Sequence, residues 1–134
     1  MIAATELRLV LVTPEKTLLD QPVKGLRFPL FDGQIGVLPG RAPLVGRLGA
    51  GELKFDVAGG GTERFFIDGG FVQIKGSVVT LLTSRAQPVS QIDSKKAQAE
   101  LDAALALKPT DDVGFSAKEQ AIVRARKMRS LGRG

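Results

Sequence analysis

The segment with the clearest potential for binding chemistry runs from Asp32 to Pro43 and reads DGQIGVLPGRAP. A glycine-rich loop binds phosphate when its backbone N–H groups face the anion at the start of a helix, usually with Lys and Ser or Thr close behind. After Gly40, however, the chain shows no helical periodicity, and Pro43 disfavours helix at the residue before it. The segment is therefore predicted to turn the chain between short strands and not to bind phosphate.

Catalytic chemistry is restricted by two residue types that the chain does not contain. None of the 134 residues is histidine or cysteine. Ser-His, Cys-His and histidine-metal sites are thereby excluded, as are disulfides and thiolate metal sites. A hydrolase that uses carboxylates alone stays conceivable, but the order of the acidic residues indicates no paired site. We therefore expect no catalytic residues, no bound metal and no obligatory cofactor.

The positive charge of the chain is concentrated at its C-terminal end. The chain carries 19 basic and 14 acidic residues, a formal net charge of +5. All of this excess lies in the last eleven residues, which contain five basic residues and no acidic one. They are Arg124, Arg126, Lys127, Arg129 and Arg133. A basic tail of this kind fits nucleic acid, an anionic membrane or an acidic protein partner, and it equally fits a solvated helix end.

Neither a signal peptide nor a membrane-spanning segment is predicted. The N-terminal stretch MIAATELRLVLV lacks the basic region of a signal peptide and meets the charged residues Glu6 and Arg8 at once. No apolar run approaches the length that spans a bilayer. If the protein works at a membrane, we expect it to act from the aqueous side.

Residues 6 to 84 are predicted to form β-strands. Leu7, Leu9 and Leu11 recur at every second position, as in a strand with one buried face. Turn signals punctuate this part at short intervals, among them Gln21-Pro22 and Asp68-Gly69-Gly70. Many short strands without an intervening helix predict a flattened β-sandwich or barrel of antiparallel strands. Six of the seven phenylalanines lie in this part and are expected to fill its core.

After Pro88 the pattern becomes helical. Residues 93 to 107 carry apolar residues at helical spacing, with Asp93 or Ser94 as the N-cap. Residues 108 to 114 break this helix, and a second one is predicted to open at Ser116 in a capping box with Glu119. The predicted apolar faces consist of Ala97, Leu101, Ala104 and Leu105 in the first helix and Ala117, Ala121, Ala125, Met128 and Leu131 in the second.

The two patterns predict two domains, a β-sandwich over residues 1–86 and an antiparallel two-helix hairpin over residues 87–134. Alanine dominates both apolar faces of the hairpin, so the helices are expected to bury little apolar area. Such a hairpin is predicted to be marginally stable alone and to detach easily from a rigid β domain. A permanently docked hairpin is the alternative.

Three stretches, in this order and spacing, resemble the epsilon-subunit family of F-type ATP synthases, whose mitochondrial equivalent is called delta. DGQIGVLPGRAPLVGRLGAGEL, from Asp32 to Leu53, is similar to the family's acidic-Gly-x-x-Gly-x-x-Pro-Gly-His-x-Pro-Leu segment with its later glycine. FFIDGGFVQIKGSVVTLLTSRA, from Phe65 to Ala86, resembles its Gly-Gly strand pair. IDSKKA, from Ile92 to Ala97, resembles its Ile/Leu-Asp-x-x-Arg-Ala box. The pattern covers nearly the whole chain.

The resemblance implies a non-catalytic subunit of the central stalk of a rotary ATP synthase driven by protons or sodium ions. By this resemblance the β domain packs on the gamma subunit, and its glycine-rich turn faces the ring of c subunits. Asp32, Gln34 and Arg41 then occupy positions expected at the rotor-ring interface. Arg41 stands where the family commonly has histidine, so a pH-sensitive role of that histidine is not carried over.

In some bacterial members the Ile/Leu-Asp-x-x-Arg-Ala box binds ATP, which keeps the hairpin folded. Transferred by position, Ile92, Asp93, Lys96 and Ala97 would be the nucleotide-binding residues. Lys96 replaces the family's arginine and lacks its planar fork, so ATP is expected to be a weak regulatory ligand or not to bind. For Asp93, the alternative role is that of a helix cap.

In the family's extended state the second helix meets acidic segments of the catalytic alpha and beta subunits and blocks ATP hydrolysis. Arg124, Arg126, Lys127 and Arg129 have the right sign of charge for this contact. The resemblance therefore implies inhibition of hydrolysis through the hairpin.

The resemblance also implies a location. It predicts peripheral attachment, only through the complex, to the cytoplasmic face of a bacterial inner (plasma) membrane, or to a thylakoid or other coupling membrane in an organelle. The rival hypothesis is a basic-tailed β-barrel that binds nucleic acid. Such barrels use aromatic stacking platforms interleaved with basic residues, whereas this chain has no Trp or Tyr and a neutral body. We therefore expect no nucleic-acid partner.

Overall fold

The strand-rich part of the chain folds into one sheet that closes on itself. The structure is a computed structural model, and it describes residues 7–40 and 43–132. Its elements are β1 (Leu7–Val12), β2 (Thr17–Leu30), β3 (Gly33–Val37), β4 (Leu44–Val57), β5 (Thr62–Lys75), β6 (Val78–Leu82), β7 (Ala86–Pro88), the 3-10 helix η1 (Val89–Gln91), α1 (Ser94–Leu105) and α2 (Asp112–Leu131).

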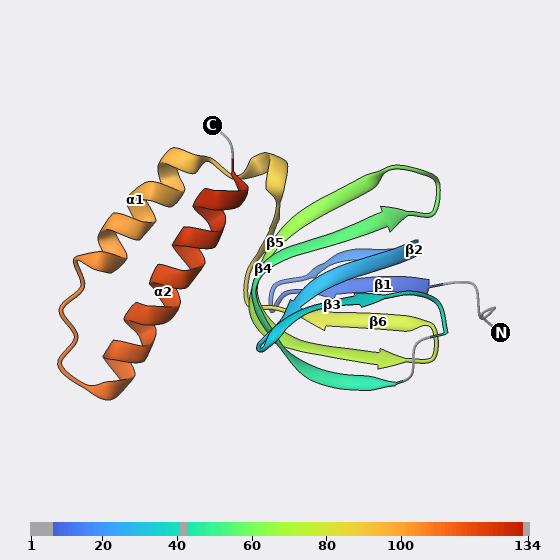
Figure 1. Cartoon of the computed structure of the whole chain (residues 1–134), viewed down its shortest axis with the longest axis horizontal. Helices are drawn as coiled ribbons and strands as arrows, with labels where there is room; N and C mark the ends of the chain where they lie inside the picture. Colours follow the sequence, from blue (N-terminus) through green and yellow to red (C-terminus); the bar gives the residue numbers. More distant parts are fainter. Residues whose placement is uncertain (1–6, 41–42, 133–134) are drawn as a thin grey trace. The chain divides into compact units, whose positions relative to one another are not determined.

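The strands follow the order β1-β6-β5-β4-β2-β3, and β7 pairs with β5 (Figure 1). Because β1 also pairs with β2, the sheet closes, which confirms the predicted flattened sandwich or barrel. One pairing differs from the antiparallel prediction, since β1 and β6 run parallel. These two strands are distant in the sequence and meet because the sheet closes.

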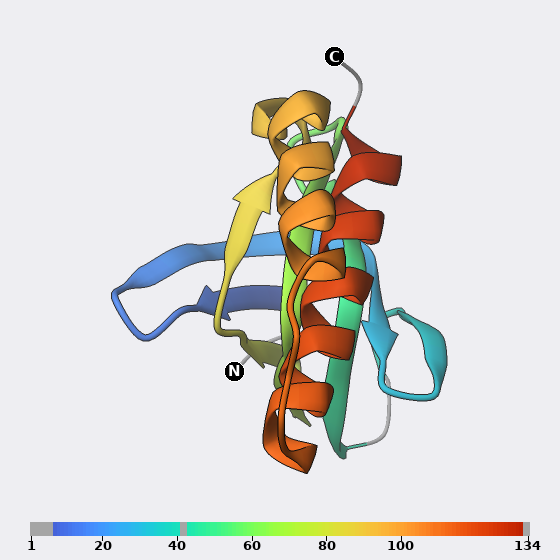
Figure 2. The same ribbon diagram turned by 90° about the vertical axis from the view of Figure 1, so that its left-hand side faces the viewer.

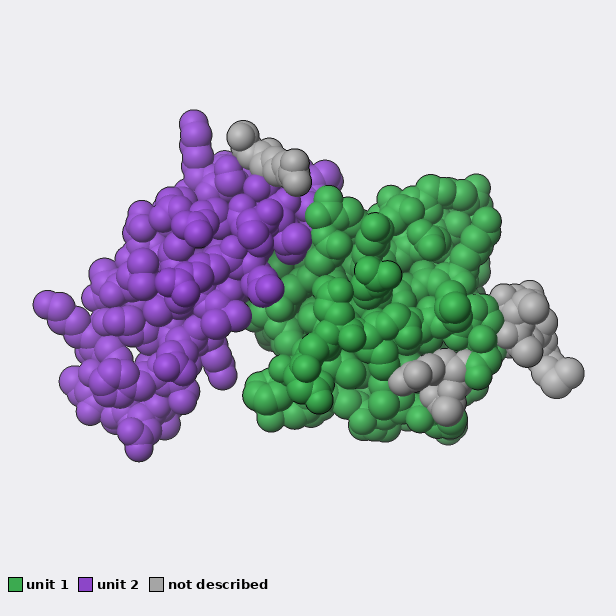
Figure 3. All heavy atoms as spheres, in the orientation of Figure 1, with its two compact units in different colours: residues 1–87 green, residues 88–134 purple. Residues whose placement is uncertain are grey.

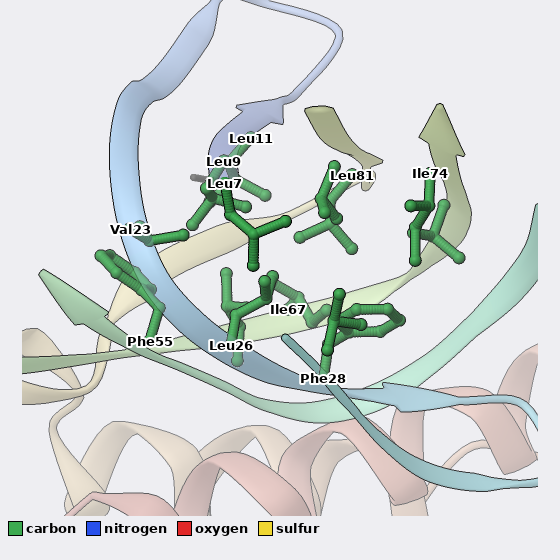
Figure 4. Close-up of a cluster of buried hydrophobic side chains, with 14 of the residues drawn as sticks. Leu7, Leu9, Leu11, Val23, Leu26, Phe28, Phe55, Ile67, Ile74 and Leu81 are labelled. Carbon is green, nitrogen blue, oxygen red and sulfur yellow. The ribbon is translucent and has the colours of Figure 1, made fainter. Parts of the chain in front are cut away.

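The core of the sheet lies between its two layers. Leu7, Leu9 and Leu11 are all buried, as their period of two predicts, and in Figure 4 they point toward side chains from the facing strands. The prediction for the phenylalanines was wrong at two positions. Phe28, Phe55 and Phe66 are fully buried, whereas Phe31 is 72% and Phe71 58% exposed.

Two predicted turns are instead places where long strands bend. Pro22 lies inside β2 at a point where β1 is the strand paired with it, because pairing with β4 begins at Val23. A residue without an N–H group is tolerated where one neighbouring strand pairs. Gly70 lies inside β5 with φ of +112°, and an added Cβ would come within 1.8 Å of the Leu82 carbonyl oxygen. Glycine therefore lets β5 bend and lets β6 approach.

The helical segment forms the predicted antiparallel hairpin, whose two helices lie side by side in both views (Figure 1 and Figure 2). The second helix was predicted to start five residues too late, with Ser116 as its N-cap in place of Asp111. It begins at Asp112, because the side chain of Asp111 accepts a hydrogen bond from the N–H group of Gly114 at 2.7 Å. Leu105 is exposed, so it does not belong to the packed face. Ala117 is exposed as well.

The chain divides into two compact units, residues 1–87 and residues 88–134 (Figure 3). We call them the β unit and the hairpin unit. Within the described residues, no helix is both long enough and apolar enough to cross a membrane.

Candidate functional site

The outer face of the sheet carries a row of exposed side chains across three strands. Arg47 of β4 lies opposite Phe71 of β5, and Phe71 lies opposite Leu82 of β6. Phe71 is 58% exposed and Leu82 is 50% exposed. Side chains at directly opposite positions have Cβ atoms about 4.5–5.5 Å apart, so these three form one continuous surface.

Two further apolar residues extend this row. The ring of Phe31, which follows the last residue of β2, contacts the guanidinium group of Arg47, whose Cζ atom lies 5.0 Å from the ring centroid. The backbone N–H of Phe31 also donates to the carbonyl oxygen of Arg47 at 2.9 Å. Val45 is 76% exposed and precedes Arg47 by two residues, so both point to the same face. We call Phe31, Val45, Phe71 and Leu82, which surround Arg47, the apolar stripe.

A signal for this stripe was present in the sequence. Val72 and Ile74 are buried, and strand side chains alternate between faces, so Phe71 had to point outward with Gln73. The prediction that the phenylalanines fill the core did not take this alternation into account. Phe31 precedes Asp32 in the turn after β2, and its exposed ring contacts the guanidinium group of Arg47.

The glycine-rich segment forms a turn and a strand. Asp32 lies in the turn between β2 and β3, Gln34 lies on β3, and both side chains are exposed. Arg41, the third residue predicted for this interface, lies outside the described residues. Ile35 and Val37 pair with β2, so the backbone of this segment is used in the sheet ladder. The next element after Pro43 is the strand β4, so no helix start lies here to receive phosphate.

The IDSKKA residues have structural roles inside the hairpin unit. Asp93 caps α1 and confirms the first of the two predicted N-caps, since its Oδ1 accepts from the N–H groups of Lys95 at 2.8 Å and Lys96 at 3.4 Å. Ile92 is 5% and Ala97 1% exposed, so both belong to the packed interior of the hairpin. The Lys96 side chain is exposed.

The basic residues of α2 do not share one face. Successive helical residues are about 100° apart, so Arg126 and Lys127 point away from the buried Ala125 and Met128. Arg129 is exposed, and its Nη1 donates to Oε1 of Gln98 on α1 at 2.9 Å. Arg124 is partly buried and also interacts with another group. The remaining basic residue of the tail, Arg133, lies outside the described residues.

A separate groove of about 460 Å³ lies over β2, β3 and β4. Its lining includes Arg27 and Lys54, which face each other directly in the β2–β4 register, and Asp56, which accepts a hydrogen bond from Thr62. None of the described residues predicted from the sequence to bind a ligand or a partner lines this groove. In the part of the chain that the structure describes, no group of three or more acidic residues is placed to hold a metal ion.

Comparisons with known proteins agree on one family. Residues 6–89 match the family model described as the beta-sandwich domain of the ATP synthase delta/epsilon chain. The ATP synthase epsilon chain of Rhodopirellula baltica is 43% identical over 120 residues, which cover 90% of this chain and 93% of that protein. The epsilon chain of Granulibacter bethesdensis is 35% identical over 115 residues, or 85% of each chain.

The similarity extends to three dimensions. A chain in the cryo-EM structure of the Euglena gracilis mitochondrial ATP synthase, which contains OSCP, F1 and the c-ring, superposes with a TM-score of 0.82. The alignment covers 94% of this chain and 81% of that one, at 26% sequence identity. The likeness therefore includes the hairpin unit as well as the β unit.

Proposed function

Because the chain belongs to the ATP synthase delta/epsilon family, we propose that it is a non-catalytic subunit of the central stalk of a rotary ATP synthase. In this role it couples the rotation of a ring of c subunits, driven by protons or sodium ions, to the gamma subunit. It also slows ATP hydrolysis through its hairpin unit. The name of the bacterial relatives and the F1 and c-ring content of the Euglena complex support this proposal.

The apolar stripe is the observation that best supports the proposal that the β unit docks on the gamma subunit. Contiguous exposed apolar side chains on a soluble domain mark interaction surfaces. Aromatic residues and arginine are enriched in the cores of such interfaces, and the stripe combines Phe31 and Phe71 with Arg47. The strands beneath these side chains are backed by a packed core, so the stripe is held in a fixed geometry.

The turn between β2 and β3 is the proposed contact with the c-ring. Asp32 directly follows Phe31 of the apolar stripe, and Gln34 lies two residues further on. The proposed ring contact therefore begins one residue after the proposed gamma contact. Arg41 belongs to the same proposed interface by its place in the sequence.

The hairpin unit is the part of the chain that we propose inhibits ATP hydrolysis. Arg124, Arg126, Lys127 and Arg129 on α2 would meet acidic segments of the alpha and beta subunits when the helices extend. Complementary charge guides such a contact in rate and orientation more than in affinity. Because the basic residues of α2 point to more than one face, we propose that α2 inserts between acidic surfaces rather than lying on one.

ATP is at most a weak regulatory ligand in this proposal. Ile92 and Ala97 are already buried inside the hairpin, and the carboxylate of Asp93 caps α1. Lys96 remains exposed and could supply a charge, but not the two-pronged contact of arginine.

The proposed place of the subunit is on the cytoplasmic face of a bacterial inner membrane, or on the coupling membrane of an organelle, attached through the complex. Enzyme activity belongs to the assembly and not to this chain. The rival hypothesis, a nucleic-acid-binding barrel, finds no support among the family and structural matches.

The docking proposal is tested by titrating the chain onto a purified core of alpha, beta and gamma subunits from the same source. Phe71→Ala should weaken binding by about 30-fold, because truncating a central aromatic anchor costs about 2 kcal/mol or more. Leu38→Ala is the control, since Leu38 lies in the β unit outside the apolar stripe and is 70% exposed. Equal affinities for the wild type and Phe71→Ala would contradict docking through the stripe.

A further inference from the structure

A row of three positively charged residues crosses three strands of the β unit. Arg27 of β2 lies directly opposite Lys54 of β4, and Lys54 lies directly opposite Arg64 of β5. All three residues are exposed. Side chains at directly opposite positions have Cβ atoms about 4.5–5.5 Å apart, and like charges in such positions destabilise a sheet. Negative charge near the row, from the chain itself or from a ligand, would remove this repulsion.

The chain neutralises one end of this row. Nε of Arg64 donates to Oε2 of Glu52 at 2.7 Å, and the two side chains form an ion pair. Among the residues that the structure describes, neither the Arg27 nor the Lys54 side chain forms an ion pair or a hydrogen bond. Arg27 and Lys54 therefore present two positive charges side by side without a carboxylate bound to either.

Arg27 and Lys54 both line the groove of about 460 Å³ over β2, β3 and β4. Gly25 and Gly36 also line it and contribute no side chain, and a Cβ added to Gly36 would meet nothing within 4 Å. Leu38 forms an apolar wall, since its Cδ2 would lie 3.1 Å from a Cβ added to Gly25. The two charges thus lie beside a hollow whose volume is typical of sites for small molecules.

The groove also contains hydrogen-bond acceptors. Asp56 follows Lys54 by two residues on β4, so both side chains point to the same face. Its Oδ1 accepts a hydrogen bond from the hydroxyl group of Thr62 at 2.9 Å, and both residues line the groove. A carboxylate can accept further hydrogen bonds, but it repels additional negative charge. The groove therefore favours a ligand with one compact anionic group and with hydrogen-bond donors on the rest of the molecule.

We propose that this groove binds a small phosphate ester that carries hydroxyl groups, with its phosphate group at Arg27 and Lys54 and its hydroxyl groups toward Asp56. A phosphate monoester carries about −1.5 to −2 charges near pH 7, which matches the two positive charges. The planar guanidinium group of arginine contacts two phosphate oxygens at once, and lysine adds a point charge. The site shares no residue with the apolar stripe, the turn between β2 and β3 or the hairpin unit, so it does not depend on the proposed function.

The site is tested by nuclear magnetic resonance of the isotope-labelled full chain. Glycerol phosphate is titrated at constant ionic strength, so that the general screening of charges stays fixed. The amide signals of Gly36, Lys54 and Thr62 should shift and should saturate at one glycerol phosphate per chain. Glycerate carries the same two hydroxyl groups but a carboxylate in place of the phosphate group. It should bind about tenfold more weakly, because it offers fewer charges and fewer oxygens to Arg27 and Lys54.

Four variants separate a built site from general attraction of anions. Arg27→Gln and Lys54→Gln should each weaken the binding of glycerol phosphate about tenfold, because each removes a charged donor. Lys75→Gln removes the same charge from an exposed position of β5 outside the groove and should change the affinity less than about twofold. Gly36→Leu keeps both charges but fills the open space of the groove, so it should abolish saturable binding.

Several outcomes would overturn the site. The wild-type chain could show no saturable shifts with glycerol phosphate, or the Arg27, Lys54 and Lys75 variants could lose affinity equally. Undiminished binding by a folded Gly36→Leu variant would show that the charges attract anions without the groove. If Gly36→Leu unfolds, the comparison of the three charge variants still decides. A short polyglutamate peptide that displaces glycerol phosphate and binds more tightly would overturn the small ligand in favour of an acidic protein segment.

Discussion

The two units of the chain are stabilised in different ways. The β unit packs large side chains from several strands, including Phe28 and Phe55, and its long strands are paired along most of their length. The hairpin unit has six buried hydrophobic residues within the described part of the chain, and three of them are alanine. Buried apolar area largely determines stability, so the β unit can present a fixed surface, while the hairpin can be controlled by a few contacts.

The first prediction concerns the stability of the β unit and is made at the bend of β5. Gly70→Ala should lower the free energy of unfolding of the β unit by about 3 kcal/mol or more, because an L side chain is strained at positive φ and would meet the Leu82 carbonyl oxygen. Urea unfolding measures the effect. Gly36→Ala is the control, since nothing lies within 4 Å of its added Cβ. A loss below about 1 kcal/mol at Gly70 would contradict the close approach of β6.

Core truncations sharpen the comparison between the units. Phe28→Ala should cost about 3–5 kcal/mol, and Leu101→Ala on α1 about 2–3 kcal/mol, because both leave cavities. Hydrogen exchange should rise across the strands in Phe28→Ala but only across the helices in Leu101→Ala. Faster exchange in both units after Leu101→Ala would show that the two unfold together.

The cap of α1 tests a smaller contribution within the hairpin. Asp93→Ala should destabilise the hairpin by about 1 kcal/mol, because two N–H groups at the start of the helix lose their acceptor. Asp93→Asn should be nearly neutral, since asparagine caps equally well. Thermal melting followed by circular dichroism measures both variants. An Asn variant as unstable as the Ala variant would mean that the charge of Asp93, and not its capping geometry, is what matters.

The smallest effect is expected in the apolar stripe itself. Arg47→Gln should lower the stability of the β unit by only about 0.5–1 kcal/mol, because the cation–π contact with Phe31 is exposed. In a Phe31→Leu background the same substitution should cost less. Equal costs in the two backgrounds would assign the effect to something other than the aromatic ring.

The sequence predicted what depends on local pattern. The alternation of Leu7, Leu9 and Leu11 identified a half-buried strand, and Asp93 was one of two predicted caps, with Ser94, because both carry acceptor groups at the start of a helical run. These features are determined by neighbouring residues. Both can therefore be inferred from the sequence without knowledge of the rest of the fold.

The errors concern contacts between distant residues. Gly70 was predicted to lie in a turn, but glycine is required there because Leu82 of another strand approaches its backbone. The same holds for Phe31, whose exposed ring lies beside Arg47 of β4. The Asp111 cap was missed because the capping box at Ser116 is an equally good signal further along.

One measurement tests the division of labour between the two units most directly. ATP hydrolysis by a purified core of alpha, beta and gamma subunits would be followed after adding either the full chain or a chain that ends at Gln87. The account predicts that both bind the core and that only the full chain slows hydrolysis. Equal inhibition by the full and the shortened chain would contradict the proposal that the hairpin inhibits hydrolysis. Failure of both chains to bind would contradict the proposed place of the subunit in the central stalk.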